Sequence, residues 1–192
     1  MYKLFNFLLV LTALSTVVQA KSTDVDLNQF TINDSVWQFE QQKKFTFLKR
    51  KIKSTGNFIL YDAQVYWHTL TPLESEMLLL AQGIYRRDAN EARYQLVTKE
   101  QRFNQLLAKL LSGRIASQDW QITPQDVATC IELKPIDTQI LNLFETVLLC
   151  AEGETQRQIM ITDQQKNQTT ITMTLKSKAL TQNEMDKVKL AQ

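Results

Sequence analysis

The sequence predicts a mainly antiparallel β protein with a few helices. Its 192 residues suit one domain, and a content of 44% hydrophobic and 22% charged residues is typical of a globular protein. Apolar side chains alternate with polar ones over much of the chain, which is typical of strands with one buried face. Turn residues separate these short runs, and one segment carries a clear helical pattern. We therefore expect a sheet of about ten strands that curls and is covered by helices on its concave side.

In the first half of the chain, the strand pattern becomes clear at Trp37. Odd-numbered positions from Trp37 to Phe47 are mostly aromatic, but Gln41 and Lys43 interrupt the row. We therefore expect two strands joined by a polar turn, preceded by a short helix over 24–33. The further strands expected in this half, bounded by Gly, Pro or polar turns, are 54–61, 65–69, 76–81, 84–86 and 93–97.

The second half contains the one clearly marked helix. Thr98 and Gln101 have the spacing of a capping box, and Gly113 stands where a helix commonly ends. Between them, apolar residues recur with helical spacing over 103–111. The remaining expected elements are strands near 120–122, 127–133, 145–151, 158–162 and 169–176, a helical turn within 136–143, and a helical or frayed tail over 182–192.

Composition excludes several classes of site. One histidine, two cysteines and four glycines leave no material for a histidine-rich zinc site, a four-cysteine cluster or a glycine-rich phosphate loop. A net charge of +2 predicts no strong field for nucleic acid. A hydrolase would depend on His68 as its base, and no GxSxG motif accompanies it. We expect no cofactor, no metal and no enzymatic activity.

The N-terminus predicts export. Residues 1–20 combine a charged start at Lys3, an apolar stretch over 4–18 and a small-residue cleavage site that ends at Ala20. We expect cleavage after Ala20, which leaves a single soluble domain over 21–192. The apolar stretch is too short and too interrupted to span a membrane comfortably.

Export changes the interpretation of the two cysteines. Cys130 and Cys150 each lie in a strand-like run, 20 residues apart. In an oxidising compartment we expect a disulfide between them if those strands pair. Two buried free thiols are the alternative.

A basic run follows the first aromatic strand. Six positive charges fall within eleven residues, with no acidic residue among them. The run suits a solvated loop, or a docking surface for anionic lipid headgroups or for an acidic exporter domain. Its members are Lys43, Lys44, Lys49, Arg50, Lys51 and Lys53.

The bulky apolar side chains of the first half have two interpretations. They fill a plain core, or sheet and helix leave an apolar cavity between them for a ligand. Periodicity alone does not separate the two. These side chains are Trp37, Phe39, Phe45, Phe58, Leu60, Tyr66, Trp67, Met77 and Leu79.

Several weak motifs occur in a meaningful order. The first is the run Phe39-x-Gln41-x-Lys43-x-Phe45, continued by Leu48, Ile52, Ser54, Gly56 and Phe58. The others are Trp67 with Pro72, an apolar strand into Gly83, Leu110-Leu111-Ser112-Gly113, Trp120, Leu133-Lys134-Pro135-x-Asp137, Gly153, 159–163 and Thr170-Ile171. In this order, over about 24–176, the chain resembles the LolA-type carriers of outer-membrane lipoproteins. It is most similar to a divergent branch that accompanies RND/MMPL-type lipid exporters.

The resemblance implies a half-open, incomplete β-barrel closed by helices, in a monomer that works in the periplasm. Its apolar cavity would shelter the acyl chains of a lipoprotein or another membrane lipid between an inner-membrane exporter and an outer-membrane acceptor. The implied lining consists of Phe39, Phe58, Leu60, Trp67, Met77 and Leu79.

The chain departs from the family in its latch and in the extra C-terminal element, which 179–192 hardly provides. Where the family carries an Arg-Pro latch for its helical lid, this chain has Leu60-Tyr61-Asp62-Ala63. A lipoprotein cargo is therefore no better supported than a glycolipid, an aryl-polyene lipid or a phospholipid. The alternative function is an accessory module that docks on an envelope lipid exporter and carries no cargo.

Overall fold

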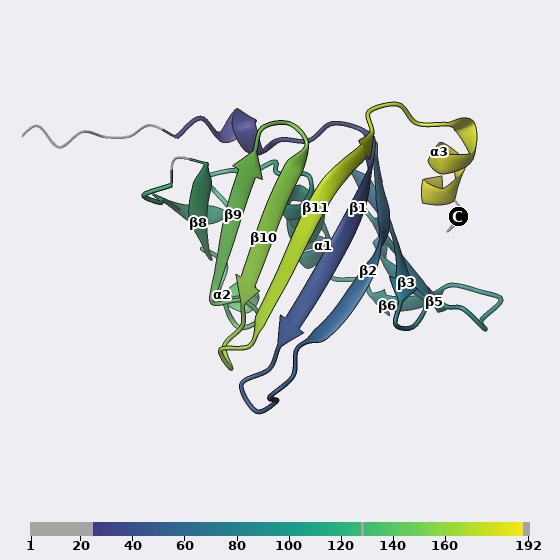
Figure 1. Cartoon of the computed structure of the whole chain (residues 1–192), viewed down its shortest axis with the longest axis horizontal. Helices are drawn as coiled ribbons and strands as arrows, with labels where there is room; N and C mark the ends of the chain where they lie inside the picture. Colours follow the sequence, from purple (N-terminus) through teal and green to yellow (C-terminus); the bar gives the residue numbers. More distant parts are fainter. Residues whose placement is uncertain (1–24, 128, 190–192) are drawn as a thin grey trace, which may run out of the picture.

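The computed structural model describes residues 25–127 and 129–189 (Figure 1), so the predicted signal segment 1–20 lies outside the described residues. Within them, eleven strands form one antiparallel sheet, accompanied by three α-helices and one 3-10 helix. The elements are η1 (Leu27–Phe30), β1 (Ser35–Lys44), β2 (Ile52–Tyr61), β3 (Gln64–Thr71), β4 (Ser75–Leu80), β5 (Gly83–Asp88), β6 (Gln95–Thr98), α1 (Gln101–Leu111), β7 (Trp120–Pro124), β8 (Cys130–Pro135), α2 (Thr138–Leu141), β9 (Thr146–Glu152), β10 (Gln156–Thr162), β11 (Gln168–Ser177) and α3 (Gln182–Lys189).

The sheet is a mainly local meander with one long-range pairing at its centre. Its strand order is β6-β5-β4-β3-β2-β1-β11-β10-β9-β8-β7, so the first and last strands of the chain lie side by side. The sheet bends around α1, as Figure 1 shows, and β6 and β7 remain its unpaired edges. This is the half-open barrel that the family resemblance implies.

The alternation of side chains gives the sheet two different faces. The inner face, toward α1, carries a large apolar cluster that includes residues from β1 to β5 and from β7 to β11. The outer face carries a smaller cluster around Tyr66 and Leu78, where Val188 of α3 is fully buried. In the part of the chain that the structure describes, no helix is long and apolar enough to cross a membrane.

Two glycines are required where main chains approach closely. Gly56 on β2 faces the ring of Phe39 on β1, and a Cβ atom there would lie 2.0 Å from the carbonyl oxygen of His68. Gly113 follows α1 with φ +64°, and a Cβ atom there would lie 1.8 Å from the carbonyl oxygen of Phe30. Gly113 thus ends the helix, as its position in the sequence predicts, and lets η1 pack against that end.

The predicted disulfide between Cys130 and Cys150 is confirmed. The two cysteines are direct partners in the pairing of β8 with β9, and their Cα atoms lie 4.1 Å apart. By the chain-entropy estimate, a crosslink across this separation of 20 residues stabilises the fold by about 3 kcal/mol.

The expectation of two strands within 37–47 is wrong. β1 is one continuous strand from Ser35 to Lys44, and the turn begins only after it. Gln41 and Lys43 keep their places in the inward row, opposite Ile171 and Thr169 of β11. They are polar because the inner face loses burial toward this end of the strand, so polarity there does not signal a turn.

Three other boundaries differ from expectation. The predicted capping box does not form, because Thr98 belongs to β6 and accepts a hydrogen bond from the main chain of Glu100, while α1 begins at Gln101. The leading helix shrinks to the single turn η1. The strand expected from Val127 begins at Cys130, and Val127 is exposed.

Candidate functional site

The six residues predicted to line a cavity come together on the inner face. All of them belong to, or pack against, the same apolar cluster, and all except Met77 are at most 7% exposed. They come from four adjacent strands in the order β1 to β4. They are Phe39, Phe58, Leu60, Trp67, Met77 and Leu79.

Aromatic rings form a continuous row across three of these strands. Phe58 stacks between Trp37 and Trp67, with ring centroids 6.2 and 5.5 Å away and interplanar angles of 9° and 12°. The ring centroids of Phe39 and Trp67 lie 3.9 Å apart, because Gly56 leaves room for the ring of Phe39. Flat, stacked rings give the inner face a broad apolar surface with few side-chain rotations to restrict.

The other half of the inner face was not singled out by the sequence-based prediction. Strands β8 to β11 contribute Ile131, Leu133, Val147, Leu149, Ile159, Ile171 and Met173, all buried. Their alternation with polar neighbours is the signal that identifies them, and it is as regular as that in β1 to β4.

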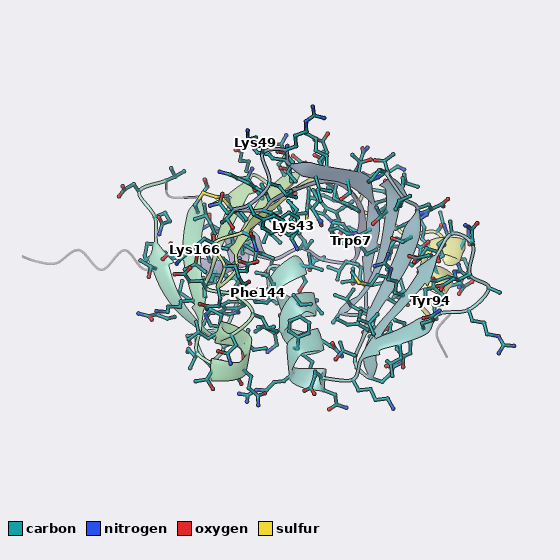
Figure 2. The ribbon with its side chains drawn as sticks, turned by 90° about the horizontal axis from the view of Figure 1, so that it is seen from below. Lys43, Lys49, Trp67, Tyr94, Phe144 and Lys166 are labelled. Carbon is teal, nitrogen blue, oxygen red and sulfur yellow. A yellow bond between two sulfur atoms is a disulfide. The ribbon has the colours of Figure 1, made fainter. Side chains whose placement is uncertain are left out.

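Helix α1 covers this apolar face. Leu106 and Leu110 are buried against it. The ring centroid of Phe103 lies 6.0 Å from that of Phe144, two residues before β9. Figure 2 shows α1 across the concave side of the sheet, with Phe144 on one side of it and Trp67 on the other. α1 therefore separates the inner face from solvent.

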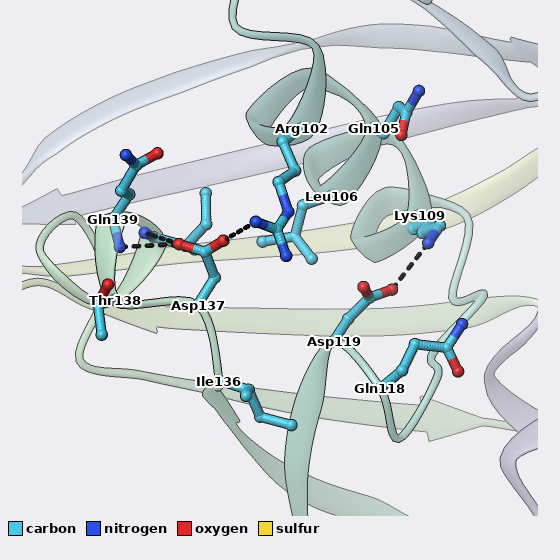
Figure 3. A pocket seen from close by; sticks show the side chains of 11 residues that line it. Arg102, Gln105, Leu106, Lys109, Gln118, Asp119, Ile136, Asp137, Thr138 and Gln139 are labelled. Atoms are coloured by element: carbon cyan, nitrogen blue, oxygen red, sulfur yellow. Dashed lines mark hydrogen bonds and ion pairs between the residues drawn. The ribbon is translucent and has the colours of Figure 1, made fainter.

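Two ion pairs hold α1 to the second half of the molecule. Lys109 Nζ lies 2.7 Å from Asp119 Oδ2, and Arg102 Nη1 lies 2.7 Å from Asp137 Oδ2 (Figure 3). Asp137 also caps α2 by accepting from the main chain of Gln139 at 2.8 Å. The pairs border a polar pocket of about 520 Å³, whose charged and amide lining does not suit acyl chains. We interpret it as the seam along which α1 meets β7 and α2.

The interior also contains an unmatched polar group on α1. Asn104 is 1% exposed, and its side-chain amide has no hydrogen-bond partner among the residues that the structure describes. With Leu79, it lines a pocket of about 300 Å³ between α1 and the turns that follow β2 and β4. An amide in this place has both a donor and an acceptor to offer to a polar group next to an apolar chain.

Arg157 closes the end of the interior beside η1. The residue is 5% exposed, and its guanidinium donates to the carbonyl oxygens of Gln29, Phe30, Gly153 and Gln156 at 2.6–3.4 Å. Burial lowers the pKa of Arg157. No sequence pattern indicates this role, because the contacts to η1 span 127 and 128 residues and involve main-chain atoms.

His68 lies away from the apolar interior. It is on the outer face of β3, with Nε2 2.9 Å from Oε1 of Glu74. The hydrolase interpretation of His68 therefore gains no support from its surroundings, since the sheet separates it from the inner face.

One family model matches most of the chain. The family is described as outer membrane lipoprotein carrier protein LolA, and the match covers residues 31–185. The chain belongs to the LolA family. A solved LolA superfamily protein from Nitrosomonas europaea is 9% identical, with a TM-score of 0.44, and the match covers 82% of this chain and 92% of that one. No curated protein matches the chain significantly.

The stretch 60–63, where the resemblance implies an Arg-Pro latch, forms the end of β2 and a tight turn. Leu60 is buried in the inner cluster, and Asp62 and Ala63 form the turn with φ of 50° and 58°. The six basic residues predicted as a docking patch lie together from the end of β1 to the start of β2.

Proposed function

We propose that this LolA-family protein is a periplasmic carrier that shelters acyl chains between its inner face and α1. The observation that carries the proposal is the continuous apolar inner face, covered by one helix whose ends are held by exposed or half-exposed ion pairs.

The energetics of the cargo require such a shelter. Exposing a 16-carbon acyl chain to water costs about 12 kcal/mol, at about 0.8 kcal/mol per methylene. The aromatic row and the aliphatic residues of β8 to β11 provide apolar contacts that offset this cost. Asn104 is suited to hydrogen-bond the ester or amide group at the head of such a chain.

Entry of an acyl chain requires α1 to move. Phe58, Leu60 and Trp67 are between 0% and 7% exposed, so the inner face is filled while α1 is in place. Two ion pairs near the surface contribute little free energy, about 0.2–1 kcal/mol each. We infer that α1 swings away from β7 and α2 when cargo binds, and that an inner-membrane exporter and an outer-membrane acceptor are the donor and the recipient.

A charge on the inner face tests the proposal. Met77 is half-buried there, so Met77→Glu places a carboxylate beside the bound chain without replacing a fully buried residue. We expect binding of a fluorescent palmitate analogue to weaken by more than about tenfold, because burying an unpaired carboxylate is costly. The matched control is Val97→Glu, at a residue of β6 that is 59% exposed, which should bind as the original protein does. Equal binding by both variants would contradict the site.

The close packing of the inner face favours one second candidate, a module that docks on an envelope exporter without carrying cargo. The same titration separates the two functions. The docking module predicts that even the unaltered protein binds no acyl probe.

A further inference from the structure

The loop between β1 and β2 is the most basic part of the described chain. Figure 1 shows it projecting beyond the end of the sheet. We call residues 43–53 the basic hairpin; all of its basic side chains except Lys43 are exposed, and the segment contains no acidic residue. Within the described residues, none of its six basic side chains forms a salt bridge.

The basic hairpin also exposes large apolar side chains. Phe47 is 76% exposed, Ile52 49% and Leu48 43%, and Phe47 and Leu48 lie at the turn itself. Leu73, in the neighbouring turn between β3 and β4, is 80% exposed. Apolar groups on a projecting tip gain little from folding, so their exposure needs another explanation.

Contacts at its base hold the basic hairpin in place. The rings of Phe45 and Phe47 are 5.3 Å apart, and the ammonium of Lys43 lies 4.9 Å above the ring of Phe45. The main-chain N–H of Thr46 donates to Oδ1 of Asn167 at 3.0 Å, and Asn167 is 9% exposed. The tip is therefore presented in a defined position beside the turn between β10 and β11.

We propose that the basic hairpin docks on an anionic lipid bilayer, with Phe47 and Leu48 inserted among the headgroups and the basic side chains bound to lipid phosphates. Basic residues beside exposed aromatic and aliphatic ones are the combination that binds membrane interfaces. An acidic protein surface would match the charge, but it would leave the apolar tip unexplained. This inference goes beyond the carrier function and does not depend on it.

Docking through the basic hairpin would bring one end of the interior, where apolar side chains are only half-buried, near the membrane. Lys43 pairs in register with Ile52 and Thr169, and Ile161 of β10 lies opposite Thr169. Ile161 and Phe144 are both half-buried and pack against the inner cluster. The end of the sheet that carries the basic hairpin thus also carries apolar side chains of the interior that are only partly covered.

Vesicle flotation tests the proposal with the exported protein. We expect binding to vesicles in which a third of the phosphatidylcholine is replaced by phosphatidylglycerol, and little binding to phosphatidylcholine alone. Lys49→Glu with Lys51→Glu should weaken binding by more than about tenfold, since each basic residue near an anionic surface contributes about fivefold. Lys134→Glu with Lys176→Glu, at exposed residues of β8 and β11, changes the net charge equally and should retain binding.

The apolar tip is tested separately. Phe47→Ser with Leu48→Ser should also abolish flotation, with unchanged far-ultraviolet circular dichroism. The proposal would be overturned if the original protein did not float with the vesicles. It would also be overturned if all the hairpin variants floated as the original protein does. Loss with the charge variant alone would overturn the insertion of Phe47 and Leu48, and would indicate a purely electrostatic contact with the lipid headgroups.

Insertion has its own spectroscopic readout. Trp37, Trp67 and Trp120 are at most 7% exposed, so a tryptophan placed at the tip reports on its own surroundings. Phe47→Trp should show a blue shift and quenching with vesicles that contain brominated lipid, and Val97→Trp should not.

The acyl-probe titration on the same samples keeps the two proposals apart, because loss of probe binding alone would count against the carrier and not against docking.

Discussion

Glu76 joins two other side chains on the outer face. Its Oε2 accepts hydrogen bonds from Arg87 and from the hydroxyl of Tyr94, which leads into β6. Arg87 also lies 4.6 Å above the ring of Tyr94. Burial acts to raise the pKa of Glu76, but the hydrogen bonds from Tyr94 and Arg87 outweigh it and hold this pKa below its ordinary value. The cluster thereby fixes the edge strand β6 onto β4 and β5.

The lowered pKa of Glu76 predicts a pH dependence of stability. A carboxyl whose pKa is lower in the folded state stabilises the fold above its ordinary pKa of 4.5, and this contribution is lost as the pH falls through the folded-state value. Glu76→Gln should therefore reduce the free energy of unfolding at pH 7 by about 1 kcal/mol. In urea denaturation at pH 3 the two proteins should converge, and a constant difference from pH 7 to pH 3 would contradict this role.

At the scale of single residues, the sequence predicted apolar positions better than polar ones. Phe58 and Trp67 were identified because a strand's period of two assigns them to a face, whatever the pairing partners are. Arg157 was missed because its hydrogen-bond acceptors belong to η1, far away in the sequence. Asn104 was not predicted as a functional residue, because it lies among the apolar residues of the helical segment 103–111.

At the scale of elements, we propose that the attachment of α1 controls access to the interior. Its apolar side chains face the sheet, while its ties to β7 and α2 are the ion pairs of Lys109 and Arg102. Removing both pairs should free the helix without disturbing the inner face.

We predict that the double variant Arg102→Gln, Lys109→Gln exchanges a bound acyl probe about fivefold faster than the original protein does. This factor corresponds to the loss of about 1 kcal/mol of stabilising free energy from the two surface ion pairs. Stopped-flow displacement of the fluorescent palmitate measures the rate. The control is Lys178→Gln, which removes a surface pair with Glu154 remote from α1. Unchanged exchange in the double variant would show that these pairs do not hold α1.

The predicted boundaries of elements are wrong where a local sequence pattern and burial in the fold favour different structures. Polar residues in an apolar row commonly mark a turn, but Gln41 and Lys43 are inward positions at a less buried end of β1. The residue type of Thr98 suits a helix cap and a strand equally well. Both errors come from tertiary context that no short window of sequence contains.

At the scale of the whole molecule, the sheet depends on pairing between the two ends of the chain. β1 pairs with β2 on one side and with β11 on the other, so the N-terminal and C-terminal halves share one interior. Periodicity predicted most of the strands but not this order; the half-open barrel followed from the family resemblance. The disulfide needed only the local pairing of β8 with β9, and was predicted correctly.

The carrier function requires that this interior holds an acyl chain. A native mass spectrum of the protein, purified from the bacterial envelope without detergent, tests it most directly. We predict a mature protein cleaved after Ala20 that carries a non-covalent adduct with the mass of a lipid, released on collisional activation. A bare protein mass that stays unchanged after incubation with lipid would contradict the account.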